Sequence, residues 1–250
     1  MAEGPRAPRD SFCAAQHWNT VIWLHLLRNG GLAMPTSTPA NPRVYRITHI
    51  DNLDTLLRRG GLHAPNYVPP DGLPYRPIHR QDIQEARMAR PVKVGPGGVL
   101  LDYIPFFFGR RPPMLLQLHT GQVKGYKEGQ GPLVYLVSRI HRIVSNGCRF
   151  IFTDGHALAR FTHWFDELAD LAAVDWDAVQ ASHWADTPDD NDRQRRKQAE
   201  FLVHEFLPWD LVDGIAVCGE GVRERVRNIL AVHQDRHRPQ VKVVRSWYYD

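Results

Sequence analysis

The stretch that most constrains what this chain can fold into runs from Arg193 to Val203 and reads RQRRKQAEFLV. Four of its first five residues are basic, and it then becomes an apolar run, 201–203, of the kind that forms a buried strand. One carboxylate, Glu200, directly precedes that run. Glu200 is therefore expected at the edge of a sheet, behind a cluster of positive charge. Two interpretations are open: a solvated basic turn followed by a surface acid, or a catalytic carboxylate that faces a polyanion.

The charge and cysteine content narrow the class of protein only slightly. The 250 residues carry a net charge of +4, with a pI of about 9.1, which suits an acidic partner but is too mild to establish nucleic-acid binding. Cys13, Cys148 and Cys218 are far apart and form no CxxC pair. We therefore expect neither a zinc site nor a disulfide framework, and a reducing cytoplasm is the natural compartment. The apolar runs are shorter than the roughly 20 residues that span a bilayer, and no signal peptide is indicated.

Residues 1–42 differ from the rest of the chain. They contain one segment with the pattern of an amphipathic helix, at about 12–28, and end in MPTSTPANP, which has the composition of a linker. Met34 could itself be the native start, or the extension could be a real accessory helix. The expected division is thus an N-terminal extension over 1–42 and one domain over 43–250.

The remaining chain predicts short strands with helices inserted irregularly between them. Helices are expected after Asp51 or Thr48, ending at Gly60-Gly61, and at 79–90, 138–146 and 220–233, with two amphipathic pieces inside 155–185 and an Asp-rich turn at 186–192. Strands are expected at 43–50, 99–108 (interrupted at Pro105), 114–119, 133–137, 148–153, 215–217 and 240–248. This order favours the α+β class over a regular βαβ alternation.

Common catalytic motifs are absent from the sequence. It contains no P-loop, no GxGxxG, no HExxH and no GxSxG. The standard signatures of phosphoryl transfer, dinucleotide-binding Rossmann domains, zinc proteases and serine hydrolases are therefore lacking.

Several short segments, in their order and spacing, resemble one family. They are YRITHIDNL at 45–53, QEAR at 84–87, GGV at 97–99 continuing to PFFF at 105–108, RPPML at 111–115, RKQAEFLV at 196–203, FLPW at 206–209 and WYY at 247–249. Together they resemble the DarT family of bacterial DNA ADP-ribosyltransferase toxins, from about Arg43 to Tyr249. The resemblance implies the ADP-ribosyltransferase fold, with a split, mostly antiparallel sheet around an NAD cleft and helices outside it. It also implies transfer of ADP-ribose from NAD to a base in single-stranded DNA, with release of nicotinamide and no metal.

The resemblance also assigns residues and partners. Glu200 matches the catalytic glutamate, and Arg87 matches the catalytic arginine on the helix that folds over NAD. Thr48, His49 and Ile50 match the NAD contact of the first strand, and Asn52 matches a nearby position. Residues from about 155 to 200 match a loop that faces DNA. The thymidine-modifying branch is the closer match, and a guanine-modifying branch also exists. Such toxins are paired with a DarG-type macrodomain antitoxin.

The chemistry explains why such residue types are needed. Cleavage of the nicotinamide–ribose bond builds positive charge on the ribose, and a carboxylate stabilises that charge better than it stabilises ground-state NAD. An arginine fork can bind the NAD diphosphate. A base nitrogen must also lose its proton, and Arg87 could serve as the proton acceptor or as an electrostatic stabiliser of the deprotonated base.

The basic cluster and the aromatic residues near it predict DNA binding. Phosphate contacts are expected from Arg193, Arg195, Arg196 and Lys197. The aromatics of 164–184 could stack on bases, although their helical spacing favours a place in the core. Two other functions stay open: transfer by the same fold to guanine, RNA or protein, and a non-catalytic nucleic-acid-binding module.

Overall fold

The computed structural model describes residues 37–250. Within these residues an eight-stranded sheet has the order β10-β9-β4-β1-β3-β7-β5-β6, and every neighbouring pair except β10–β9 is antiparallel. The strands are β1 Arg43–His49, β3 Tyr103–Phe107, β4 Leu133–Arg139, β5 Phe150–Thr153, β6 Trp164–Phe165, β7 Glu200–His204, β9 Gly214–Val217 and β10 Gln240–Val243. A second, two-stranded sheet pairs β2 Gly61–His63 with β8 Phe206–Pro208. The expected α+β class is confirmed.

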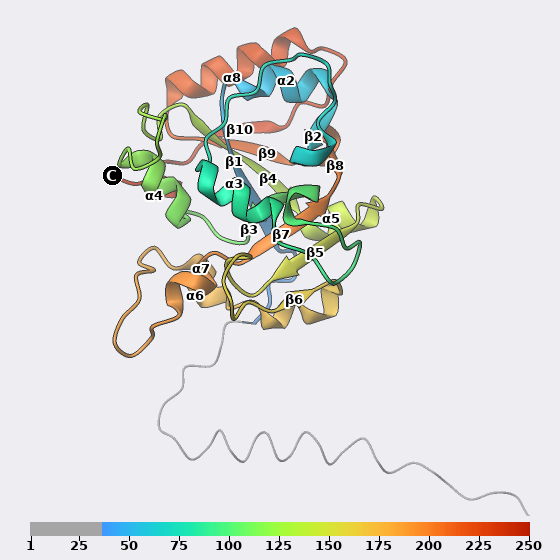
Figure 1. Cartoon of the computed structure of the whole chain (residues 1–250). Coiled ribbons are helices and arrows are strands. Elements are labelled where there is room, and N and C mark those ends of the chain that lie inside the picture. Colours follow the sequence, from blue (N-terminus) through green and yellow to red (C-terminus); the bar gives the residue numbers. More distant parts are fainter. Residues whose placement is uncertain (1–36) are drawn as a thin grey trace, which may run out of the picture. The chain divides into compact units, whose positions relative to one another are not determined.

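Helices and short 3-10 turns surround the large sheet. The helices are α2 Asn52–Arg58, α3 Gln81–Met88, α4 Pro113–His119, α5 Ile140–Ser145, α6 Trp176–Gln180, α7 Arg193–Lys197 and α8 Glu220–Val232. Figure 1 shows α2 and α8 side by side near β10, at one end of the sheet order, and α6 and α7 near the other end. Helix α3 lies in front of the sheet in this view.

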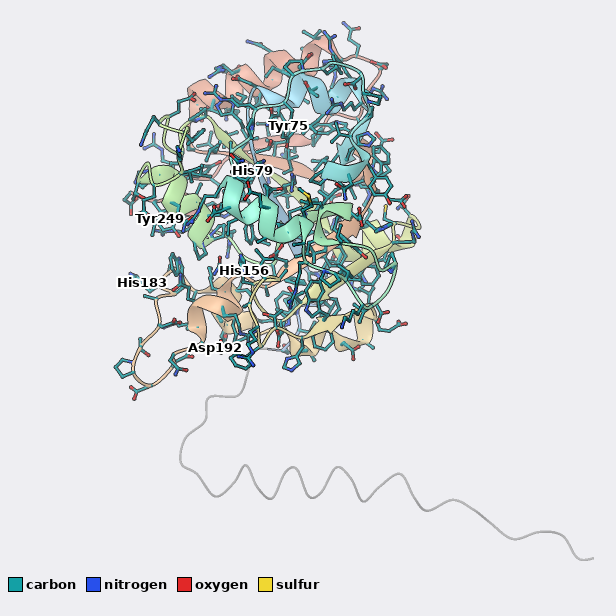
Figure 2. The ribbon with its side chains drawn as sticks, viewed as in Figure 1. Tyr75, His79, His156, His183, Asp192 and Tyr249 are labelled. Atoms are coloured by element: carbon teal, nitrogen blue, oxygen red, sulfur yellow. The ribbon has the colours of Figure 1, made fainter. Side chains whose placement is uncertain are left out.

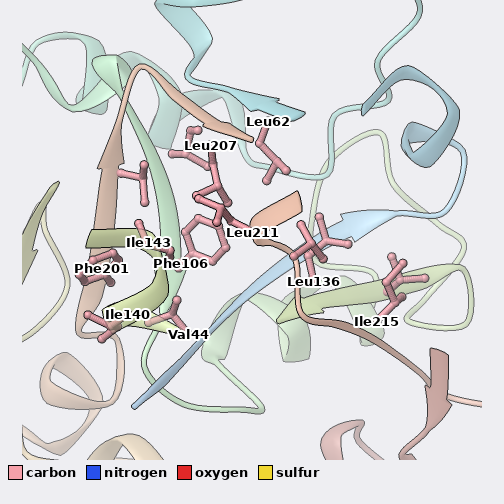
Figure 3. Packing of buried hydrophobic residues seen from close by; sticks show 14 of the residues in the cluster. Val44, Leu62, Phe106, Leu136, Ile140, Ile143, Phe201, Leu207, Leu211 and Ile215 are labelled. Atoms are coloured by element: carbon pink, nitrogen blue, oxygen red, sulfur yellow. The ribbon is translucent and has the colours of Figure 1, made fainter. Parts of the chain in front are cut away.

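The core follows from the alternation of side chains along the strands. On β4, Val134 and Leu136 belong to the larger apolar cluster, whereas Tyr135 and Val137 belong to a second cluster. Figure 3 shows the larger cluster, to which five strands contribute Val44, Phe106, Leu136, Phe201 and Ile215. The strand that begins at Glu200 is therefore central and buried, so the interpretation as a solvated turn with a surface acid is wrong.

The sheet opens between β1 and β3, where Pro105 lies. β1 pairs with β4 along all seven residues but with β3 only at Tyr45 and Phe107. The bonds Glu205 N–H to Asp102 O and Phe108 N–H to Ala199 O place the even-numbered residues of β3 in the ladder with β7. The backbone of Pro105 consequently faces β1, where no ladder needs its missing N–H.

The expectation of an interruption at Pro105 is therefore wrong, because β3 continues through it. The carbonyl of Pro105 accepts a hydrogen bond from Arg46 Nη1 at 3.0 Å instead of from a backbone amide. The interruption lies earlier, where a 3-10 turn occupies Leu100–Asp102.

Most of the other expected strands and helices are present in the structure. Strands expected at 43–50, 133–137, 148–153 and 215–217 and helices expected at 79–90, 138–146 and 220–233 are confirmed within a few residues at their ends. Gly60 ends α2 with a φ of 71°, as expected of a helix-terminating glycine. The Asp51 side chain stands at the N-cap position but makes no capping hydrogen bond.

Two expected strands are wrong in whole or in part. The strand at 114–119 is helix α4, because Pro113 starts a helix and Leu115 and Leu118, three apart, share its buried face. The strand at 240–248 ends at Val243, and a 3-10 turn, Arg245–Trp247, follows.

The helix expected at 12–28 and most of the proposed linker lie outside the described residues. Among residues 37–250, no helix is long and apolar enough to cross a bilayer. In the same range, no group of three histidine, cysteine or acidic side chains could hold a metal ion.

Candidate active site

Glu200 is held in a fixed position at the start of β7. It pairs with Phe107 of β3, and its side chain is only 4% exposed. Its Oε1 atom accepts a hydrogen bond from the backbone N–H of Ala157 at 3.1 Å. Its backbone N–H donates to Thr153 Oγ1 on β5 at 3.2 Å. A central strand thus fixes the carboxylate, and the loop after β5 orients it.

Arg87 meets Glu200 across 113 residues of sequence. It lies in the last turn of α3, and its Nη1 atom donates to Glu200 Oε2 at 3.0 Å. Its Nη2 atom is buried and has no hydrogen-bond partner within residues 37–250. A buried guanidinium donor without a partner is costly, which is typical of a group that awaits a ligand. The structure therefore brings the two predicted catalytic residues together.

The Arg87–Glu200 pair lines a cavity beside the opening between β1 and β3. Apolar side chains, among them Ile47, Ile83 and Phe107, form part of the wall. Donors converge on the same space from Arg46, His79, Arg80, Arg87 and His156. A mostly apolar wall with a few convergent polar groups is typical of a small-molecule site. The guanidinium groups suit a diphosphate, and the apolar wall suits a planar ring, so this set of residues fits NAD.

Two histidines of the cavity are poised to be neutral at physiological pH. Burial lowers the pKa of His79. Burial also lowers the pKa of His156, and the nearby Glu200 carboxylate opposes that shift only in part. His156 Nδ1 accepts a hydrogen bond from Leu158 N–H at 3.3 Å, so Nε2 carries the proton when the ring is neutral. In the view of Figure 2 these two histidines lie on opposite sides of α3.

The residues predicted for the first-strand contact are buried beside this cavity rather than in its wall. Asn52 holds the segment before α3, because Nδ2 donates to Arg76 O at 2.9 Å and Oδ1 accepts from Arg76 N–H at 2.6 Å. Nδ2 also donates to Thr48 Oγ1 at 3.1 Å. Ile50 belongs to the larger apolar cluster, and its backbone is engaged as well, since its N–H donates to Pro132 O at 2.9 Å and its carbonyl accepts from Leu53 N–H at 3.1 Å.

His49 has an unused polar atom. Its Nδ1 atom accepts a hydrogen bond from Asp51 N–H at 3.2 Å. Its Nε2 atom is buried, lies 3.4 Å from Glu128 Oε2, and has no hydrogen-bond partner in the part of the chain that the structure describes. Burial lowers the pKa of His49, while Asp51 partly opposes this. A neutral imidazole with a free nitrogen is thus available beside Ile47, which lines the cavity.

Three of the four residues of the basic cluster have internal partners. Arg195 bonds Asp154 at 2.8 Å and Asp192 at 2.7 Å. Arg196 bonds Asp175, Asp190 and Asp192. Lys197 is 1% exposed and donates to Val179 O at 2.8 Å and Ala181 O at 2.6 Å. Arg193 alone of the four has no ion-pair or hydrogen-bond partner within residues 37–250.

Some residues of the site escaped the sequence analysis. Arg46, His79 and His156 line the cavity but were not predicted as site residues, although Arg46 lies within the YRITHIDNL segment. The signal that could have found His156 is its place just after the strand expected at 148–153. Trp176, considered for base stacking, is buried in the larger cluster, and Phe165 packs against that cluster.

The fold and the site define an ADP-ribosyltransferase: a split, mostly antiparallel sheet with a buried carboxylate–arginine pair beside a cavity that fits NAD. Residues 45–249 match the family model for the ssDNA thymidine ADP-ribosyltransferase DarT. The chain belongs to the DarT family, as its motifs indicated, and it is an NAD-dependent DNA ADP-ribosyltransferase.

Two relatives named as DNA ADP-ribosyl transferases match along their whole length. A DNA ADP-ribosyl transferase of Thermus sp. strain 2.9 is 42% identical over 216 residues, covering 86% of this chain and 100% of the relative. A DNA ADP-ribosyl transferase of Escherichia coli O127:H6 is 32% identical over 221 residues, covering 87% of this chain and 100% of the relative.

Solved structures of the Thermus protein show the same fold. The complex of Thermus sp. 2.9 DarT with ADP-ribosylated ssDNA has a TM-score of 0.81 at 42% identity, covering 86% of this chain and 100% of that one. The complex of the same protein with NAD+ has a TM-score of 0.75 at 40% identity, covering 85% of this chain and 100% of that one. The predicted ADP-ribosyltransferase fold is therefore confirmed.

Proposed function

We propose that this protein transfers ADP-ribose from NAD+ to a thymine base in single-stranded DNA and releases nicotinamide. The observation that carries the proposal is the buried contact of Arg87 with Glu200 at 3.0 Å inside a cavity that fits NAD+. The description of the matching family model supports thymidine as the acceptor, and the Thermus relative solved with ADP-ribosylated ssDNA supports a single strand.

Glu200 stabilises the ribose as the bond from its C1′ carbon to nicotinamide breaks. Its Oε1 atom is held by Ala157 N–H and its Oε2 atom by Arg87. Because both oxygens are fixed before the reaction, the carboxylate does not have to reorganise as positive charge develops on the sugar. The electron pair of the broken bond leaves with nicotinamide. The base nitrogen releases its proton to solvent water and forms the new bond to C1′.

Arg87 acts on the acceptor base as well as on NAD+, the donor of ADP-ribose. Nη1 is committed to Glu200, and Nη2 is free. A free guanidinium donor can stabilise the deprotonated base nitrogen without accepting a proton itself, since an arginine stays protonated in proteins. We therefore favour electrostatic stabilisation over proton acceptance for Arg87.

The first-strand residues hold the NAD+ from the side of β1. His49 offers Nε2 as a neutral hydrogen-bonding group, whereas the side chain of Ile50 packs in the core and its backbone bonds Pro132 and Leu53, so Ile50 holds His49 in place. The side chains of Thr48 and Asn52 bond each other, and Asn52 also bonds the backbone of Arg76 in the segment before α3. Their contribution is to orient His49 and the cavity wall.

The basic cluster has two different roles. Arg193 is free to contact a DNA phosphate. Arg195, Arg196 and Lys197 are engaged within the protein, and their role is to hold the loops around Glu200. Phosphate contacts from all four residues would require ion pairs with Asp154, Asp175, Asp190 and Asp192 to break.

The biological role that fits this activity is that of a toxin. Modification of bases in single-stranded DNA would block replication in the producing cell, which would need a counteracting enzyme. A DarG-type macrodomain antitoxin that removes the ADP-ribose, in a shared cytoplasm, is the partner we propose on the basis of family membership.

The test is mass spectrometry of one thymine-containing oligonucleotide incubated with the protein and NAD+, as a single strand and annealed to its complement. We expect an ADP-ribose adduct on the single strand alone, because a duplex must first be unpaired and unstacked at a cost of about a few kcal/mol. Glu200→Gln should lower the yield on the order of 10²-fold or more. Glu224→Gln, an exposed glutamate of α8, is the matched control and should be fully active.

Two results would contradict this function. Equal modification of both DNA forms would remove the requirement for a single strand. An adduct found only on RNA or protein offered in the same assay would show that the acceptor is a different one.

A further inference from the structure

Phe161 is an aromatic side chain that the fold does not use. It is 74% exposed, whereas most other phenylalanines of the described range are buried or half-buried. It lies in the loop between β5 and β6, five residues after His156 of the cavity. Exposure of one apolar side chain is common in itself, so its neighbours decide whether it has a role.

The loop that carries Phe161 is rigidly attached to the catalytic carboxylate. Ala157 N–H donates to Glu200 Oε1, and Thr162 Oγ1 donates to His156 O at 2.8 Å. Arg195 ties both ends of the loop, since its Nη1 atom donates to Asp154 Oδ1 at 2.8 Å and to Thr162 Oγ1 at 3.2 Å. The hydrogen bonds of its neighbour Thr162 therefore fix the backbone at Phe161, and the same loop bonds Glu200 through Ala157.

The loop also carries an unneutralised cation beside the ring. The Arg160 guanidinium carbon lies 5.6 Å from the centroid of the Phe161 ring. Arg160 is exposed and has no carboxylate partner within residues 37–250. An exposed aromatic face next to a free guanidinium is the pair of groups with which proteins bind unpaired nucleotides, the ring by stacking on a base and the cation at a phosphate.

We propose that Arg160 and Phe161 form a binding site for the nucleotide next to the modified base, with Phe161 stacking on its base and Arg160 contacting its phosphate. This site rests on the proposed function, because it assumes a single-stranded DNA acceptor at Glu200. It adds affinity for DNA without taking part in the chemistry. Stacking is tolerant of base identity, so the site favours any base over an abasic position.

The experiment measures steady-state kinetics and DNA binding for Phe161→Ala, Phe161→Trp and Arg160→Ala. In Phe161→Ala the KM for a single-stranded oligonucleotide should rise roughly tenfold, which matches the loss of one stacked base, while kcat and NAD+ affinity stay unchanged. Phe161→Trp should restore the wild-type KM. Arg160→Ala should reduce the slope of log Kd against log salt by about one. Val232→Ala, an equally exposed apolar residue (77%) on α8, is the matched control.

An abasic scan of the oligonucleotide makes the test specific. Abasic sites flanking the thymine are introduced one at a time, and one of them should weaken wild-type binding but leave Phe161→Ala unchanged. An unaltered KM in Phe161→Ala, with wild-type enzyme that modifies DNA, overturns this site and leaves the proposed function standing. Wild-type protein that neither binds nor modifies single-stranded DNA overturns the proposed function and this site with it.

Discussion

Lys197 provides a quantitative test of how the basic cluster is used. Its ammonium nitrogen is buried against the carbonyls of Val179 and Ala181, at the C-terminal end of α6. Burial, together with the positive charges of Arg110, Arg111 and Arg193, lowers the pKa of Lys197 from 10.5 to about 7. In its neutral form the amine has two N–H groups, which match the two carbonyls.

The pH dependence of stability follows from this shift. The unfolded chain holds the Lys197 proton up to pH 10.5, whereas the folded protein releases it near pH 7. The unfolded state therefore binds more protons between these values, and the free energy of unfolding rises with pH by about 1.36 kcal/mol per pH unit. Burial of Cys148 and Cys218 raises their thiol pKa values and acts in the opposite sense. A variant at Lys197 alone isolates the lysine contribution.

Lys197→Met keeps the side-chain volume and removes the proton. Below pH 7 the variant loses two hydrogen bonds but is also relieved of a buried charge, so its stability should lie near that of wild type. From pH 7 to 9.5 the stability of wild type relative to the variant should grow by about 3 kcal/mol. Urea unfolding followed by tryptophan fluorescence at several pH values measures this difference. Parallel curves for wild type and Lys197→Met would refute the reasoning, and Lys124→Met, at an exposed lysine, should run parallel to wild type.

Two further predictions concern NAD+ and the N-terminal extension. His49→Ala should weaken NAD+ binding roughly fivefold, the value of one neutral hydrogen bond of about 1 kcal/mol, and should leave DNA affinity unchanged; calorimetric titration measures both, and equal NAD+ affinity would make His49 structural. A protein that starts at Met34 should keep full transferase activity, because every motif of the family lies after residue 42. Loss of activity or solubility in that truncated protein would mean that the extension belongs to the folded domain.

Local sequence patterns predict the elements that depend only on neighbouring residues. The β-prone, mostly apolar runs of β1 and β4, which are buried along almost their whole length, and the glycine at position 60 are properties of this kind, and the structure follows them. Short apolar runs are ambiguous because the same residues can serve a strand or a helix. In the segment 114–119, Pro113 at the first position of α4 favours the helix over the strand. The course of β3 through Pro105 depended on the absence of a ladder with β1, which no local pattern contains.

The candidate site depends on contacts between distant segments. Arg87 and Glu200 meet over 113 residues, so only the order of several motifs along the chain could place them in one site. Arg46 and His79 reach the cavity through the opening of the sheet and the packing of α3. Arg46 lies in the family segment at 45–53, but that segment does not show that its side chain faces the same cavity as Glu200. The fold therefore had to be known before the cavity could be assembled.

The basic stretch before Glu200 shows why a cluster of charge in a sequence is weak evidence for a nucleic-acid contact. The Asp-rich turn at 186–192, which the sequence presents as a separate connection, supplies Asp190 and Asp192 to Arg196 and Arg195. Asp154 and Asp175 complete the network from two other elements. The two charged segments form one structural unit, in which ion pairing and burial leave Arg193 as the free cation of the four. Because only unpaired cations can displace counterions from DNA, the salt dependence of DNA binding should reflect Arg193 and Arg160 and not the charge count of residues 193–197.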